Sequence, residues 1–387
     1  MPQAIGAGLL VALVGYASSV AVVIQGLSAV GASSAEIASA LVALGLAKGL
    51  LAIGLSLRYR LPVSIAWTTP GAALLVSTGM VQGGFAAAVG AFMAVGFLVI
   101  LAAFWRPLGR LIGAIPTPIA SAMLAGILLK LCLAPFLALA EMPLLALPVL
   151  LAWLVIGRFA RLLAVPVALL LALALIAASS PDLELAGAGL WPGLVFVPPA
   201  WSWEAMIGIA LPLFIVTMAS QNVTGFAVLS TFGYRPPVTP VLAATGFASI
   251  LAASFGAITV NLAAITAALC AGPEAGSDPA RRYLAAVVGG IGYIVLAGLA
   301  GIAASLVAVA PPTLIEAVAG LALMAAFGQS ASNAFAEEAE RLPALVTFLV
   351  TASGLAFFGI GAAFWGLVCG LLVRLVYRAA GPGLSRR

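Results

Sequence analysis

The sequence predicts an all-α polytopic membrane protein, and three observations support this fold class. Of its 387 residues, 64% are hydrophobic and only 7% are charged, whereas roughly 25% of the residues in a soluble domain are charged. The mean hydropathy is +1.26. The apolar residues form runs close to the roughly 20 residues that a helix needs to cross a bilayer. We therefore expect a bundle of helices that lies in the lipid bilayer.

The composition also excludes several classes of function. The chain has no histidine, and its three cysteines, Cys132, Cys270 and Cys369, are scattered through apolar sequence. We therefore expect no disulfide, no metal site, no cofactor and no histidine-based catalysis, so the chain is predicted not to be an enzyme. The net charge is +5, but the basic residues come singly or in pairs rather than as a patch. We therefore expect no nucleic-acid partner.

Cut at its charges, prolines and glycines, the chain yields fourteen apolar segments, whose boundaries come from the sequence alone. The first half contains segments one to seven, at residues 4–30, 36–57, 62–79, 82–104, 108–130, 142–157 and 162–179. The second half contains segments eight to fourteen, at residues 204–230, 238–254, 257–271, 282–309, 312–327, 343–353 and 355–377. Several segments of the second half are too short to cross a bilayer alone.

The basic residues predict the orientation of these segments. With a cytoplasmic N-terminus, one side of the membrane receives all the arginines, at positions 58, 60, 106, 110, 158, 161, 235, 281, 282, 341, 374, 378, 386 and 387. The opposite side receives only Lys130 as a base, together with Glu36, Glu141, Asp182, Glu184 and Glu204. This asymmetry follows the positive-inside rule, so both termini are predicted to be cytoplasmic. A count of twelve segments would place some arginines outside and fits less well.

An internal repeat divides the chain into halves. The segment from Pro118 to Gly126 resembles the segment from Pro312 to Gly320 at an offset of 194 residues. At similar offsets, Gln25-Gly26 falls opposite Gln221-Asn222, and residues 65–68 fall opposite residues 258–261. Because each half would hold seven helices, an odd number, the second half would be inverted in the membrane. Inverted repeats are typical of secondary transporters, although alanine- and leucine-rich helices also resemble one another by composition.

Segments three and ten are each interrupted near their middle. In segment three, Pro62 is followed by Trp67, Thr68 and Thr69, and Pro70 can begin a new helix. In segment ten, Gly256 is the breaker and Asn261 lies near the new helix start. Two half-helices entering from opposite sides would direct two partly positive N-termini at one point in the midplane, which suits a small anion. The alternative is that Thr68, Thr69 and Asn261 only bond backbone carbonyls.

Segments one and eight carry further polar side chains. Ser220, Gln221, Asn222 and Thr224 interrupt an otherwise apolar span, and unpaired amides are costly in hydrocarbon. We therefore expect Gln221 and Asn222 to face a wet pocket or the ligand. The counterpart Gln25 would face the same centre, or else form a hydrogen bond between helices.

Two ionisable residues in apolar segments are candidates for coupling. Lys48 lies ten residues, or about 15 Å of helix, before Arg58, so it is predicted near mid-membrane. It would act as a counter-ion for an anion or as a group that releases its proton when desolvated; the alternative is a lysine that caps carbonyls in the bundle. Glu316 lies four residues past Pro312 and is predicted near the outer edge.

These motifs together resemble the benzoate membrane transporter (BenE) family. The resemblance rests on residues 62–74 (PVSIAWTTPGAAL), residues 218–225 (MASQNVTG), residues 232–237 (FGYRPP) and residues 261–266 (NLAAIT). It implies a benzoate/proton symporter of the bacterial inner membrane. It also implies a fold similar to the nucleobase–ascorbate and sulfate-permease transporters, with fourteen segments in two inverted repeats. Such relatives often pair through their gate domains, so a homodimer is one expectation.

The resemblance implies a division into core and gate domains and a set of pocket residues. The core would comprise residues 1–105 and 202–310, and the gate residues 106–180 and 311–378. The nucleobase relatives tend to carry a carboxylate in segment eight or ten, where this chain has amides; an amide suits an anionic substrate. The candidate substrate-binding residues are Gln25, Ile65, Ala66, Trp67, Thr68, Thr69, Gln221, Asn222, Thr259 and Asn261.

The proton carrier and two alternative functions stay open at this stage. Benzoate could bring its own proton, or Lys48 or Glu316 could titrate. The same fold could carry another small anion or a nucleobase-like substrate, or the chain could be an anion channel. An intramembrane enzyme would need a catalytic constellation, and the eleven carboxylates lie mostly at membrane edges.

Overall fold

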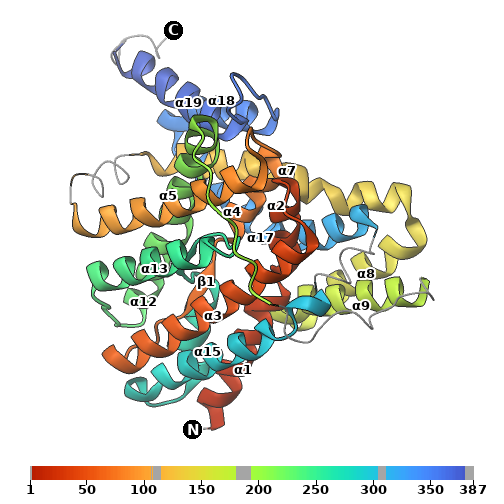
Figure 1. Cartoon of the computed structure of the whole chain (residues 1–387), viewed down its shortest axis with the longest axis vertical. Coiled ribbons are helices and arrows are strands. Elements are labelled where there is room, and N and C mark those ends of the chain that lie inside the picture. The colour runs from red at the N-terminus through yellow and green to blue at the C-terminus, as the bar shows by residue number, and fades with distance from the viewer. Residues whose placement is uncertain (1, 106, 108–114, 180–192, 304–310, 380–387) are drawn as a thin grey trace.

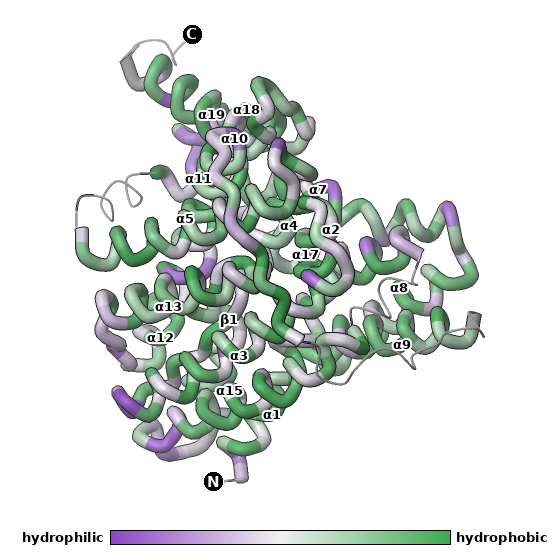
Figure 2. Tube along the Cα trace, viewed as in Figure 1, coloured by the Kyte–Doolittle hydropathy of each residue, from purple (hydrophilic) through white to green (hydrophobic). Residues whose placement is uncertain are grey.

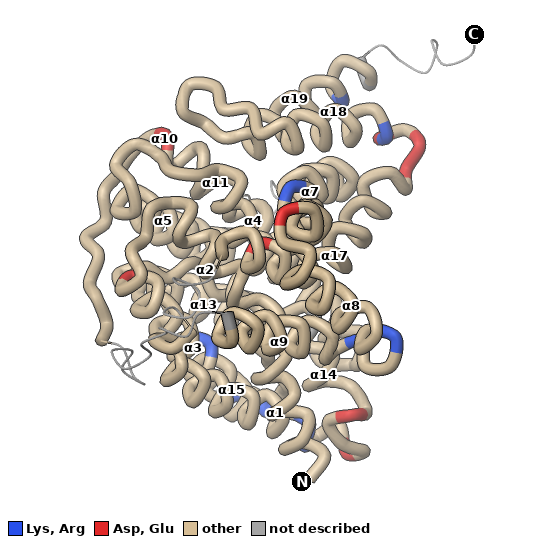
Figure 3. The backbone as a smooth tube through the Cα atoms, turned by 90° about the vertical axis from the view of Figure 1, so that its right-hand side faces the viewer, with Lys and Arg blue, Asp and Glu red and all other residues tan. Residues whose placement is uncertain are grey.

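The computed structural model describes residues 2–105, 107, 115–179, 193–303 and 311–379, and these residues are mostly helical (Figure 1). Eight helices within the described residues are long and apolar enough to cross a membrane. Figure 2 shows hydrophobic residues along most of their length, and Figure 3 shows charged residues as a few isolated bands. The predicted class, a polytopic helical membrane protein, is therefore confirmed.

The first half of the chain contains one strand and eight α-helices with described bounds. The elements are α1 (Pro2–Ala17), α2 (Val20–Ala29), α3 (Ser34–Tyr59), β1 (Ile65–Trp67), α4 (Thr69–Thr78), α5 (Gly84–Phe104), α7 (Thr117–Glu141), α8 (Pro143–Phe159), the 3₁₀ turn η1 (Arg161–Leu163) and α9 (Ala164–Ser179).

The second half contains the matching strand and further helices. The elements are α10 (Trp203–Ala205), η3 (Met206–Ala210), α11 (Leu211–Thr217), η4 (Met218–Asn222), α12 (Val223–Thr231), α13 (Val238–Ala253), β2 (Val260–Leu262), α14 (Ile265–Ala271), η5 (Pro273–Ala275), η6 (Pro279–Arg281), α15 (Tyr283–Ala297), α17 (Pro312–Ala334), η7 (Glu338–Glu340), α18 (Arg341–Ala352) and α19 (Ala362–Ala379).

Local sequence accounts for several helix boundaries. A capping box starts α3, because the Ser33 hydroxyl accepts a hydrogen bond from Glu36 N and the Glu36 carboxylate accepts one from Ser33 N. The same helix ends at Arg60, which adopts the left-handed conformation with φ 51°. Prolines lie at the start of α7, α8 and α17, where a missing N–H costs nothing.

Several predicted segments differ in detail from the structure. The twelfth, predicted at residues 312–327, continues to Ala334 in α17, and the fourteenth, predicted at residues 355–377, begins at Ala362 in α19. The first span is divided into α1 and α2, with a break at Ser18 and Ser19. The eighth contains two π-helical turns, η3 and η4. The fifth was predicted at residues 108–130, but its helix α7 runs from Thr117 to Glu141; residues 108–114 lie outside the described residues.

The shift of the fifth segment places Lys130 differently from the prediction. We expected this lysine at the membrane edge because a charge usually ends an apolar run. It lies instead within α7, about 20 Å of helix from Thr117, and its side chain is exposed. The helix continues past it to Glu141 and contains Pro135 in its interior.

Pairs of long helices pack closely where glycines face each other. A Cβ atom on Gly246 of α13 would lie 2.7 Å from the carbonyl oxygen of Gly96 on α5, and the reverse distance would be 2.8 Å. The same reciprocal contact joins Gly49 of α3 to Gly290 of α15, at 2.6 and 2.8 Å. These four positions therefore need glycine for the backbones to touch.

The helices α7 and α17 form a third close pair, which runs antiparallel. Thr313 at the start of α17 donates a hydrogen bond to Glu141 at the end of α7 (3.0 Å). Further along, Gly320 packs against the backbone of Leu131. Both helices begin at the repeated prolines, Pro118 and Pro312.

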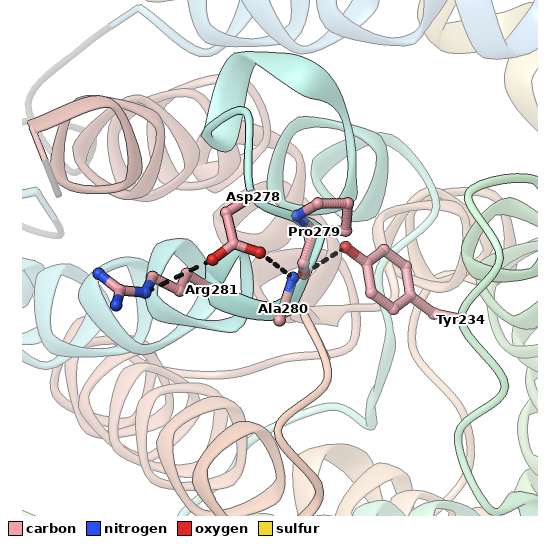
Figure 4. A network of polar contacts seen from close by, with 5 residues as sticks. All are labelled: Tyr234, Asp278, Pro279, Ala280 and Arg281. Atoms are coloured by element: carbon pink, nitrogen blue, oxygen red, sulfur yellow. Dashed lines mark hydrogen bonds and ion pairs between the residues drawn. The ribbon is translucent and has the colours of Figure 1, made fainter.

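Loops from distant parts of the chain meet at the helix ends. Tyr234, after α12, donates a hydrogen bond to the carbonyl of Pro279 (2.8 Å), and Asp278 caps Ala280 and contacts Arg281 (Figure 4). At other helix ends, Ser39 of α3 donates to the carbonyl of Phe255 (3.1 Å). The first and last described helices, α1 and α19, lie toward opposite extremes of the long axis (Figure 1).

Candidate functional site

The two interrupted segments meet in an antiparallel strand pair. Ile65 lies opposite Leu262, Ala66 opposite Asn261, and Trp67 opposite Val260. The ladder continues at both ends, because Thr68 N donates to Thr259 O (3.2 Å) and Ala263 N donates to Ser64 O (3.0 Å). Non-helical backbone inside a membrane must satisfy its N–H and C=O groups within the protein. Here each interrupted segment supplies partners to the other.

Side chains of neighbouring helices satisfy the outer edge of β2. Ser249 of α13 accepts a hydrogen bond from Val260 N (3.0 Å) and contacts Val260 O (3.3 Å). Asn222 of η4 accepts from Leu262 N (3.0 Å), and Asn261 Nδ2 donates to Leu262 O (2.8 Å). A similar arrangement precedes β1, where Ser56 of α3 bonds both N and O of Val63. Hydrogen bonds from side chains of α3, α13 and η4 therefore hold both interrupted segments in place.

A half-helix follows each strand, as the sequence predicts. Thr68 is the N-cap of α4, and its hydroxyl accepts from Gly71 N (3.1 Å) and from the hydroxyl of Thr217 on α11 (3.1 Å). Pro70 occupies the first turn of α4, where its missing N–H costs nothing. In the second half, Gly256 has φ +83° and ends the preceding helical stretch. The helix α14 begins at Ile265, four residues after Asn261.

The strand pair has a polar face and an apolar face. Because side chains alternate along a strand and directly opposed residues share a face, Ala66, Thr68, Thr259 and Asn261 lie on one face. We call this the polar face; Ile65, Trp67, Val260 and Leu262 form the apolar face. Within the described part of the chain, the Thr259 hydroxyl and Asn261 Oδ1 are buried without a hydrogen-bond partner. Buried polar atoms without partners are uncommon and mark candidate ligand contacts.

Lys48 lies against the apolar face. Its side chain is 1% exposed, and its Nζ lies 3.5 Å from the centroid of the Trp67 ring and 3.8 Å from that of Tyr293. Tyr16 is further away, at 5.9 Å. The Trp67 indole N–H donates to the Ser19 hydroxyl (2.8 Å), at the break between α1 and α2. Lys48 is thus enclosed by aromatic rings.

Comparison with known proteins connects this geometry to a family. The family model described as benzoate membrane transport protein (BenE) matches residues 1–376. The chain belongs to the BenE family. It is 43% identical over 371 residues to an inner membrane protein, YdcO, of Escherichia coli, covering 95% of this chain and 94% of that one. It is 34% identical over 376 residues to a benzoate membrane transport protein of Acinetobacter baylyi, covering 96% and 94%.

Solved structures with little sequence identity share the fold of this BenE-family chain. The transmembrane domain of the cyanobacterial bicarbonate transporter BicA matches with a TM-score of 0.59 at 17% identity, covering 97% of this chain and 96% of that one. SLC26A9 matches with a TM-score of 0.61 at 14% identity, covering 97% and 66%. This BenE-family protein is thus a membrane transporter with an SLC26-like fold, and it is not an enzyme.

The structure of the BenE-family chain brings together most of the predicted site residues. Ile65, Trp67, Thr68, Thr259 and Asn261 belong to the strand pair or its ends, and all five are buried. Ala66 and Thr69, which belong to the same segment, are half-buried, and the side chains of Gln25 on α2 and Gln221 on η4 are also half-buried. Glu316 is half-buried in α17, on a helix that packs against α7 and α2.

Asn222 and Trp67 are among the predicted residues whose side chains already have hydrogen-bond partners within the protein. The Asn222 amide oxygen is used by Leu262 N, so this side chain positions β2. The Trp67 indole lies on the apolar face with its N–H used by Ser19. These hydrogen bonds neither support nor contradict a role of Asn222 or Trp67 in substrate binding, so that role stays a prediction.

Sequence reasoning missed several residues that build the site. Ser56 and Ser249 both hold backbone beside a strand, and they are 193 residues apart, close to the repeat offset. The repeat could therefore have identified them. Thr217 and Tyr293 carry weaker signals, because a lone hydroxyl residue in an apolar span usually has a structural partner.

Proposed function

We propose that this BenE-family chain is a secondary active transporter that imports benzoate, a small aromatic carboxylate, in symport with protons. The observation that carries the proposal is the polar face of the strand pair, where the Thr259 hydroxyl and the Asn261 amide are buried without full hydrogen bonding. This face lies beside the N-terminus of α4. Benzoate would bind there, near the membrane midplane.

The chemistry of this face suits a carboxylate. The Thr259 hydroxyl can donate a hydrogen bond to a carboxylate, and the Asn261 Nδ2 group has a second N–H besides the one that it donates to Leu262 O. The partial positive charge at the N-terminus of α4 adds a favourable field for an anion. The half-buried side chains of Gln25, Thr69 and Gln221 would complete the polar lining.

The relatives support a small anion as the substrate. One relative that is 34% identical is named as a benzoate membrane transport protein. The structural neighbours are described as a bicarbonate transporter and as an anion transporter, and bicarbonate resembles the carboxylate group of benzoate. Proton symport would let a cell accumulate this anion against its membrane potential.

We also propose fourteen segments in two inverted repeats. Segments three and ten each run from strand to half-helix, and their antiparallel pairing suits a two-fold relation in the membrane plane. The glycine contacts repeat as well: Gly96 and Gly290 are 194 residues apart, and each faces a glycine on its partner helix. The core domain (residues 1–105 and 202–310) would move against the gate domain (residues 106–180 and 311–378).

Uptake of labelled benzoate into proteoliposomes tests the function. An inward proton gradient is expected to drive protein-dependent uptake above the passive flux of benzoic acid, measured in protein-free vesicles. The Asn261→Ala variant is expected to lose benzoate affinity by about 10- to 100-fold, because a hydrogen bond to a charged group contributes roughly 1.5–3 kcal/mol. The Asn333→Ala variant is the control, because Asn333 is exposed and bonds only Gln329.

Three outcomes would contradict the proposal. A lack of protein-dependent uptake by folded protein would remove benzoate as the substrate. Uptake that is inhibited more strongly by a nucleobase or another small anion than by benzoate would reassign the substrate. Electrical conductance without saturation or coupling to the gradient would indicate a channel.

A further inference from the structure

Lys48 is a buried ionisable residue that has no ion-pair partner among the described residues, unlike the buried Glu340. Among the described residues, two charged side chains are buried, Lys48 and Glu340. Glu340 pairs with Arg374 at 2.8 Å. Lys48 forms no ion pair with any described residue, and its Nζ contacts the rings of Trp67 and Tyr293 instead. Ring faces stabilise an ammonium ion, but they do not neutralise its charge as a carboxylate would.

The elements around Lys48 contain no acidic residue. The helices and strands that pack against α3, namely α2, α13, α15, β1 and β2, have no Asp, Glu or His, and neither does α1. Their titratable groups are Tyr16, Tyr283 and Tyr293, and the Tyr293 hydroxyl donates to Val11 O (3.1 Å). On α3 itself, Glu36, Arg58 and Tyr59 lie at the helix ends, at least ten residues or about 15 Å away. Cys270 on α14 is buried in the same apolar cluster as Tyr293.

Trp67 connects Lys48 to the polar face. The indole contacts Lys48 on the apolar side of β1, while the next residue, Thr68, caps α4 and bonds across the ladder to Thr259. The indole N–H also holds Ser19 at the break between α1 and α2. The Trp67 side chain therefore connects Lys48 to the strand pair, to the N-terminus of α4 and to the break between α1 and α2. A change in the charge of Lys48 can act on all three through this one side chain.

We propose that Lys48 is the proton-carrying residue of the transport cycle, and that Trp67 couples its protonation state to the strand pair. The inference rests on the proposed benzoate symport and deepens it. The proton binds to the Nζ lone pair to give the ammonium ion that the two rings hold. It leaves to the aqueous side to which the site is open, and Nζ then becomes a neutral amine. An arginine could not perform this step, because its guanidinium does not release a proton.

The position of Lys48 separates this role from direct binding of the substrate. Trp67 lies on the apolar face of the strand pair, whereas Thr259 and Asn261 lie on the polar face. The Lys48 Nζ lies 3.5 Å from the centroid of this Trp67 ring, and the Lys48 side chain is 1% exposed. Lys48 is thus a positioning and coupling residue in the proposal, and the polar face supplies the ligand contacts.

The composition of the chain allows a direct measurement of this lysine. Lys48 and Lys130 are the only lysines in the sequence, so protein labelled with ¹³C and ¹⁵N in lysine gives two side-chain NMR signals. The Lys130→Arg variant assigns them, and the exposed Lys130 of the native protein serves as the internal control. The signals are followed from pH 6 to pH 10, where a benzoate carboxylate stays ionised, with and without saturating benzoate.

The expected result has two parts. In the substrate-free protein, the Lys48 signal changes from ammonium to amine within this range, and the Trp67→Leu variant moves the midpoint because one ring face is lost. Saturating benzoate moves the midpoint upward by about one pH unit, which corresponds to roughly tenfold tighter binding by the protonated protein. The Lys130 signal is expected to be the same with and without benzoate and in the Trp67→Leu variant.

Each contrary result has a distinct meaning. A Lys48 signal that keeps one protonation state throughout would overturn the inference, as would a midpoint that does not move when calorimetry shows bound benzoate. If folded protein binds no benzoate, the proposed substrate fails. In that case the native protein and the Trp67→Leu variant are compared without benzoate. A different titration midpoint of Lys48 in the variant supports the coupling of Lys48 to the strand pair, and an equal midpoint overturns it.

Transport by lysine variants gives an independent readout. The Lys48→Met and Lys48→Arg variants are expected to exchange labelled benzoate for unlabelled benzoate across the membrane, because exchange needs no change of protonation. Both are expected to lose accumulation driven by the proton gradient. Gradient-driven accumulation by Lys48→Met at the native level would overturn the inference.

Discussion

At the scale of single residues, the site separates into side chains that hold the backbone and side chains that are left for a ligand. Ser249 and Asn222 satisfy the free edge of β2, so their polar groups are already used. Thr259 and Asn261 keep buried oxygen atoms without partners among the described residues. This division predicts that Thr259→Val mainly weakens substrate binding, whereas Ser249→Ala mainly lowers stability.

The Thr259→Val variant tests a residue left for the ligand. Because the hydroxyl has no partner in the substrate-free protein, its replacement by a methyl group is expected to leave stability unchanged or slightly higher. Benzoate affinity is expected to fall by about tenfold, the equivalent of ~1.4 kcal/mol. Calorimetric titration measures the affinity and thermal unfolding in detergent measures the stability. Native affinity in a folded variant would show that this hydroxyl does not contact the substrate.

The Ser249→Ala variant tests a residue that holds the backbone. Its loss leaves Val260 N without its buried partner, so we expect a destabilisation of about 1–3 kcal/mol. Thermal unfolding in detergent measures this change. The control is Ser230→Ala, because Ser230 is exposed and bonds only its own helix. Equal unfolding temperatures for the two variants would contradict the structural role of Ser249.

At the scale of elements, close contacts between helices position the strand pair. The helices α3 and α13 carry the serines that hold β1 and β2, and each touches a partner helix through a reciprocal glycine contact. The distance between backbones at these contacts therefore fixes where the serines lie. A larger residue at a contact glycine would displace the whole element.

The Gly246→Ala variant tests this packing. A new Cβ would lie 2.7 Å from the Gly96 carbonyl, and overpacking of this kind costs roughly 1–3 kcal/mol. The matched control is Gly54→Ala on α3, where nothing lies within 4 Å of the new Cβ. That control is expected to stabilise the protein by about 0.8–1 kcal/mol through helix propensity. Thermal unfolding of both variants in detergent makes the comparison, and a stabilised Gly246→Ala protein would contradict the close contact.

At the scale of the whole molecule, the apolar exterior and the sparse charges suit a chain surrounded by lipid. Large apolar side chains such as Leu144, Phe159 and Trp203 are more than four-fifths exposed. Soluble proteins rarely expose many large apolar side chains together. The contact between Tyr234 and Pro279 brings two loops with arginines to one end of the helices. The predicted orientation places this end in the cytoplasm.

Labelling of introduced cysteines tests the orientation. In a background without Cys132, Cys270 and Cys369, the Ala35→Cys variant is expected to react with a membrane-impermeant maleimide in intact cells. The Ser277→Cys variant is expected to react only after permeabilisation, because its loop carries Arg281 and Arg282. Both positions are exposed in the structure. The reverse pattern of labelling would place both termini outside the cytoplasm.

The sequence by itself determined the membrane class, most span positions, the two interrupted segments and the family resemblance. These properties follow from hydropathy, prolines and motifs, which are local. Only the tertiary structure decided that Ala66 lies opposite Asn261, that Asn222 accepts a hydrogen bond from Leu262 N, and that the Lys48 Nζ contacts the Trp67 ring. Local patterns do not encode these contacts, because each depends on which face a side chain takes after helices from distant parts of the chain have packed together.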